Sequence, residues 1–75
     1  MTKELYIMLK TSAEADKAKA LLSLDLLGNK AVGIGDHSTE DFYKNAEEAL
    51  VTLVDADDRL STLEKYFNNP TTLND

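Results

Sequence analysis

Three apolar runs punctuate the chain, and charged, polar or glycine residues bound each of them. The first lies within residues 4–10, the second within residues 30–35, and the third within residues 49–54. Short apolar runs with such boundaries are typical of buried β-strands, and the third run is also rich in β-branched residues. We therefore expect three strands.

Helix signals separate the first two runs. Thr11 and Glu14 have the spacing of a capping box, and good helix formers continue from there to Leu27. Thr11 or Ser12 should therefore cap a long helix, and Gly28 should end it in a left-handed conformation.

The second half predicts two further helices. Ser38 precedes acidic residues in the way an N-cap does, which predicts a short helix before the third strand. Asp55 or Asp57 should cap a final helix, and the sequence Asn-Asn-Pro at residues 68–70 should end it.

The alternation of these elements predicts an α/β fold in which helices pack on a three-stranded sheet. The expected order is strand, helix, strand, short helix, strand, helix. An alternative order, strand–helix–strand–strand–helix, treats residues 36–47 as a loop. We expect one domain over residues 1–69 and a flexible tail over residues 70–75. The expected core residues are Leu5, Ile7, Leu9, Leu21, Leu22, Val32, Leu53, Leu63 and Phe67.

Length and composition narrow the class of protein. A chain of 75 residues holds one domain with a thin core. The absence of cysteine excludes disulfides, thiolate metal sites and thiol nucleophiles, and it points to a reducing compartment such as the cytoplasm. No apolar run approaches the roughly 18 residues of a membrane span, and no signal-peptide pattern opens the chain.

Charge is unevenly distributed along the sequence. Residues 1–35 carry five lysines and four acids, whereas residues 36–75 carry three basic residues and ten acids. Nucleic acids and anionic membranes require clustered basic residues, so neither is an expected partner. A basic protein surface is the expected partner, because an acidic surface steers it into contact. The acidic face that we expect to bind it comprises Glu40, Asp41, Glu47, Glu48, Asp57 and Asp58.

One segment suggests a small-ligand site. Backbone amides of a glycine turn before a helix can receive an anion. The residues concerned are Gly33, Gly35, Asp36, His37 and Ser38. The simpler interpretation is a glycine turn with Ser38 as a helix cap. His37 is the single histidine and has no nucleophile paired with it by sequence, so we expect no catalytic residues and no enzyme activity.

The acids at residues 55–58 suggest calcium binding, but the required spacing is missing. A calcium-binding loop that began at Asp55 would need a turn-forming residue at its sixth position and a carboxylate at its twelfth. Leu60 and Tyr66 occupy those positions. We therefore expect no metal site and no cofactor.

Leucines in the first expected helix exceed what one buried face needs. Leu24 or Leu26 should therefore be exposed in a monomer, either as ordinary surface or as part of a homodimer interface.

The chain is short, acidic and free of cysteine. In this respect the chain resembles the small host-directed inhibitors and adaptors of phages. The resemblance implies a non-enzymatic protein-binding module. The alternative is a small-ligand-binding regulatory domain with its ligand near Gly33–Ser38.

Overall fold

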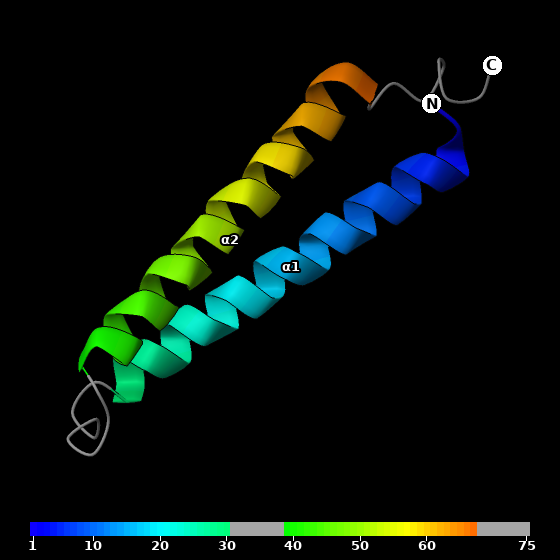
Figure 1. Cartoon of the computed structure of the whole chain (residues 1–75). Helices are drawn as coiled ribbons and strands as arrows, with labels where there is room; N and C mark the ends of the chain where they lie inside the picture. Colours follow the sequence, from blue (N-terminus) through cyan, green and yellow to red (C-terminus); the bar gives the residue numbers. More distant parts are fainter. Residues whose placement is uncertain (31–38, 68–75) are drawn as a thin grey trace.

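The computed structural model describes residues 1–30 and 39–67, which form two long helices. Helix α1 spans Lys3–Lys30 and helix α2 spans Thr39–Phe67. The helices run antiparallel, so the start of α1 and the end of α2 lie at the same end of the molecule (Figure 1). The result is an elongated helical hairpin with principal extents of 57 × 13 × 13 Å.

The expected α/β fold is wrong for the described residues, which contain no strand. Residues 4–10 belong to α1 and residues 49–54 belong to α2, while residues 31–35 lie outside the described ranges. A short apolar run does not by itself distinguish a strand from a helix, and here each run continues a longer helix. The β-branched residues of α2 cost a helix only a few tenths of a kcal/mol each, which packing readily offsets.

The cap of α1 lies nine residues before Thr11, the first residue expected to cap it. Thr2 caps the helix: its hydroxyl oxygen accepts a hydrogen bond from the Leu5 amide at 3.2 Å. The hydroxyl of Thr11 instead donates to the carbonyl oxygen of Ile7 at 2.7 Å, as threonines inside helices do. Gly28 lies within α1 and has no positive φ, so the prediction that it ends the helix is also wrong.

Helix α2 is one continuous helix over the region where the sequence predicted a short helix, a strand and a final helix. Its start at Thr39, with Glu40 and Asp41 in the first turn, confirms the position of the second helix start. The alternative that residues 36–47 form a loop is wrong for residues 39–47. The helix continues through Asp55 without a break and ends at Phe67, which confirms the stop signal at residues 68–70.

Buried side chains recur every seven residues on both helices. They are Tyr6, Ala13 and Ala20 on α1, and Ala49, Ala56 and Leu63 on α2. A seven-residue repeat keeps one seam of each helix facing the other. Four of the six are alanines, and small side chains allow two helices to approach closely. The contact between the helices is therefore narrow, and the only side chains with no exposed surface among the described residues are those of Ala13 and Ala56.

The expected core is only partly correct. Leu63 is buried, and Leu9 and Leu53 are half-buried. Val32 lies outside the described residues. The remaining five members of the expected core are exposed: Leu5, Ile7, Leu21, Leu22 and Phe67. A two-helix hairpin has no third layer to cover these side chains, whereas a sheet would have covered them.

Neither α1 nor α2 contains a segment long and apolar enough to cross a membrane.

Candidate protein-binding surfaces

The six residues of the expected acidic face all lie on α2, and all are exposed. At 100° per residue they spread over several sides of that helix. Asp57 turns toward α1, where its Oδ1 lies 3.1 Å from Nζ of Lys17. Glu47 and Asp58 lie on the opposite, outward side. The structure therefore unites the acids on one element but does not gather them into one compact patch.

Helix α2 is nevertheless strongly acidic as a unit. It contains eight acids and three basic residues, whereas α1 contains four acids and five lysines. Because α2 is continuous, this negative charge extends along one side of the hairpin. Its potential acts on an approaching partner within about 8–10 Å at physiological ionic strength.

Exposed aliphatic side chains lie within this acidic helix. Leu50, Val51 and Val54 are 53%, 68% and 52% exposed. With Asp55 and Asp58 they line a surface hollow of about 350 Å³. The sequence had placed these aliphatic residues in a buried strand, and only their helical spacing shows that they share a face.

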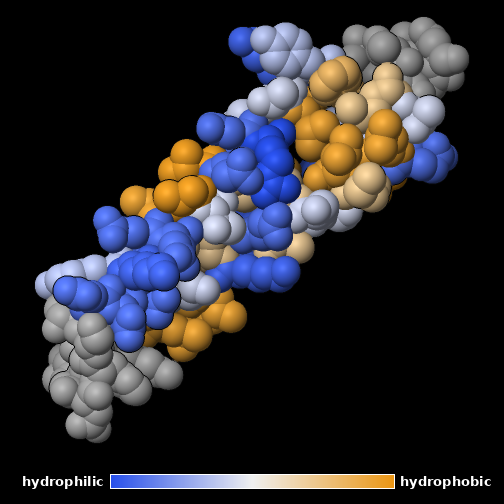
Figure 2. Space-filling model, in the orientation of Figure 1, coloured by the Kyte–Doolittle hydropathy of each residue, from blue (hydrophilic) through white to orange (hydrophobic). Residues whose placement is uncertain are grey.

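Glu47 completes this surface on the side toward the start of α2. It lies three, four and seven positions before Leu50, Val51 and Val54, which are the spacings of neighbours on a helix. We call Glu47, Leu50, Val51, Val54, Asp55 and Asp58 the α2 face. Figure 2 shows a hydrophobic area at the outer edge of α2, bordered by hydrophilic side chains.

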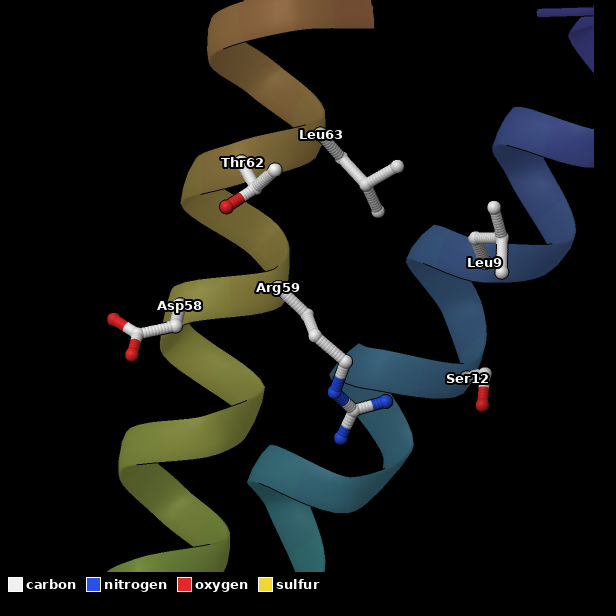
Figure 3. A pocket seen from close by; sticks show the side chains of 6 residues that line it. All are labelled: Leu9, Ser12, Asp58, Arg59, Thr62 and Leu63. Atoms are coloured by element: carbon white, nitrogen blue, oxygen red, sulfur yellow. The ribbon is translucent and has the colours of Figure 1, made fainter.

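A second hollow lies between the helices. It measures about 310 Å³ and is lined by Leu9, Ser12, Asp58, Arg59, Thr62 and Leu63. Arg59 and Leu63 extend from α2 toward α1, whereas Asp58 extends away from it (Figure 3). This hollow results from the narrow packing of the hairpin. Although four of its six residues are polar or charged, most of the atoms that line it are apolar.

Arg59 fixes the register of the two helices beside this hollow. Its Nη2 donates to Oδ2 of Asp16 at 2.8 Å, and its Nε donates to Oδ2 of Asp55 at 3.0 Å. The hydrogen bond to Asp16, reinforced by the charges of Asp55 and Asp16, raises the pKa of the Arg59 guanidinium, and burial opposes this only in part. Arg59 therefore remains a cation held between two carboxylates.

The expected small-ligand residues lie outside the described ranges. They are Gly33, Gly35, Asp36, His37 and Ser38. Within the described residues, no three histidine or acidic side chains are grouped so that they could hold a metal ion.

Exposed apolar side chains of α1 are the feature that the sequence interpretation missed. Leu26 is exposed, as expected, while Leu24 is half-buried. Leu5, Met8 and Leu22 are exposed as well. Leu5 and Met8 are three residues apart, Leu22 and Leu26 are four apart, and two heptads separate Met8 from Leu22. This helical spacing was visible in the sequence, but the strand assigned to residues 4–10 concealed it.

The chain matches no known family model, and neither characterised proteins nor solved structures include a significant match. The surfaces themselves therefore carry the functional argument.

Proposed function

We propose that this protein is a non-enzymatic protein-binding module that binds a basic, amphipathic protein segment through the α2 face. One observation carries the proposal: three exposed aliphatic side chains of α2 are flanked by Glu47, Asp55 and Asp58. An inhibitor or adaptor of the phage type, working in a reducing compartment such as the cytoplasm, is the kind of protein that this surface suits.

The two parts of the face contribute differently to binding. Burial of Leu50, Val51 and Val54 supplies affinity, because contact removes apolar surface from water. The surrounding carboxylates select basic partners and raise the association rate, because opposite charges steer the encounter. A partner helix with leucines on one side and lysines at its edges has the matching chemistry.

A synthetic amphipathic helical peptide of leucine and lysine tests the proposal. Its dissociation constant for the full chain is measured by calorimetry at low and at physiological ionic strength. We expect binding that weakens with added salt, and no binding of a peptide in which glutamate replaces lysine. Equal binding of the two peptides would contradict the proposed role of the acidic residues.

Matched charge reversals separate the α2 face from net charge alone. E47K/D58K changes this face, while E14K/D25K changes net charge by the same amount on α1. We expect the first pair to weaken peptide binding several-fold more than the second. Equal weakening by both pairs would show that the peptide responds only to overall charge and would reject the α2 face.

A further inference from the structure

Helix α1 carries a second seam beside the one that packs against α2. Its apolar members are Leu5, Met8, Ala15, Leu22 and Leu26, and all of them are exposed. Ser12 and Lys19 occupy the two polar positions of the same series. Successive members are three or four residues apart, which is the spacing of a helix–helix seam. The outer seam lies about 120° around α1 from the buried positions Tyr6, Ala13 and Ala20, at 100° per residue.

The large apolar side chains of the outer seam are substantially exposed. Leu5, Met8, Leu22 and Leu26 are 43%, 52%, 58% and 46% exposed. Contact with a second chain would remove this apolar surface from water, which favours association.

The outer seam is complementary to itself in the antiparallel direction. If Ala15 lies opposite the partner's Ala15, then Met8 lies opposite the partner's Leu22, and Leu5 lies within one residue of the level of the partner's Leu26. In the same register Ser12 lies within one residue of the level of the partner's Lys19. Apolar residues thus meet apolar residues, and polar residues meet polar residues. This symmetry is what a two-fold interface needs, because the same patch must serve both copies.

Charge favours the same arrangement. A two-fold axis at Ala15 brings the two α1 helices together, and each has five lysines against four acids. The α2 helices, each with eight acids and three basic residues, then lie on the outside of the assembly. Contact through α2 would instead bring two strongly acidic helices together, and like charges repel.

We propose that a second copy of this chain covers the outer seam, with the two α1 helices antiparallel about an axis at Ala15. The assembly is a two-fold dimer of hairpins. The α2 face does not take part in it and remains available, so the dimer and the partner surface are independent features of the same molecule.

A cysteine placed at the proposed axis tests the register. The chain has no cysteine of its own, so A15C introduces a single thiol. We expect mild oxidation of A15C to give a disulfide-linked dimer at low protein concentration. The matched variant A18C, on an exposed position of α1 away from the seam, should remain largely uncrosslinked. Equal cross-linking of both variants would contradict the proposed register.

Neighbouring leucines provide the second test. Leu22 belongs to the outer seam and Leu21 does not, although they are 58% and 48% exposed. We expect sedimentation of the full chain to give twice the monomer mass of 8.3 kDa. L22E should weaken dimerisation at least about tenfold, because it buries a carboxylate opposite the partner's Met8, and L21E should leave it nearly unchanged.

Two results would overturn the dimer. The first is a wild-type chain that stays monomeric up to millimolar concentration and an A15C variant that does not cross-link. The second is a dimer that L22E and L21E weaken equally. Neither result affects peptide binding at the α2 face, so failure of the dimer is distinguishable from failure of the proposed function.

Discussion

Arg59 and Asp16 join the two helices although 43 residues separate them in sequence. Nη2 of Arg59 lies 2.8 Å from Oδ2 of Asp16, and both side chains are about one-third exposed. Together with the pair Lys17–Asp57, this contact defines an antiparallel register in which facing residue numbers add to about 75. The buried alanines lie along the seam that this register aligns.

A double-mutant cycle of R59M and D16N measures this contact. We expect a favourable coupling free energy at low ionic strength, because each single variant leaves the other charge without its interhelical partner. In 1 M sodium chloride the coupling should shrink markedly, since screening then acts within about 3 Å. Urea unfolding at one fixed protein concentration is the measurement. A control cycle of R59M with D25N should show no coupling, and a coupling as large as that for Asp16 would contradict the register.

The buried alanines should not tolerate larger side chains. A13L and A56L each place three extra carbon atoms at a position with no exposed surface. We expect each variant to lower the free energy of unfolding by about 1–3 kcal/mol, because the helices must move apart. A18L, on an exposed position of α1, should change the free energy of unfolding by less than about 0.5 kcal/mol. Thermal unfolding followed by circular dichroism distinguishes these outcomes, and a tolerated A13L would contradict close packing at this level of the hairpin.

Thr2 and Thr11 should respond in opposite ways to alanine. T2A removes the hydroxyl that accepts the Leu5 amide and should cost up to about 1 kcal/mol. T11A removes only a hydroxyl bonded back to its own helix, and alanine is the better helix former, so the variant should be neutral or slightly more stable. Urea unfolding followed by far-ultraviolet circular dichroism measures both. A large loss for T11A would mean that α1 starts where the capping-box pattern placed its start.

Two leucines of α2 should differ in their contribution to stability. Leu63 is buried, so L63A should lower the free energy of unfolding by about 2–4 kcal/mol. Leu53 is only half-buried, and L53A should cost about 1–2 kcal/mol. A central strand in a sheet would have made Leu53 the more costly of the two. The unfolding free energies of the two variants, measured under the same conditions, show whether L63A or L53A costs more.

The sequence by itself determined several local features of this protein. It placed a helix start next to Ser38 and a helix end at residues 68–70, because acidic first turns and proline act within a few residues. It also showed that the acidity belongs to the second half of the chain, and that half contains α2. These signals depend on neighbours along the chain and need no tertiary contact.

Only the tertiary structure decided whether the apolar runs are strands or helices. The run near Leu5 is apolar on consecutive positions because α1 carries both an inner seam against α2 and an outer seam, and together they surround much of the helix. The run near Val51 likewise combines half-buried Leu53 with the exposed residues of the α2 face. Such runs look like buried strands in sequence, because periodicity reveals a helix only when one side of it is apolar. Which face pairs with which depends on contacts between residues far apart in the sequence, and pairs such as Arg59–Asp16 appear only once the chain has folded.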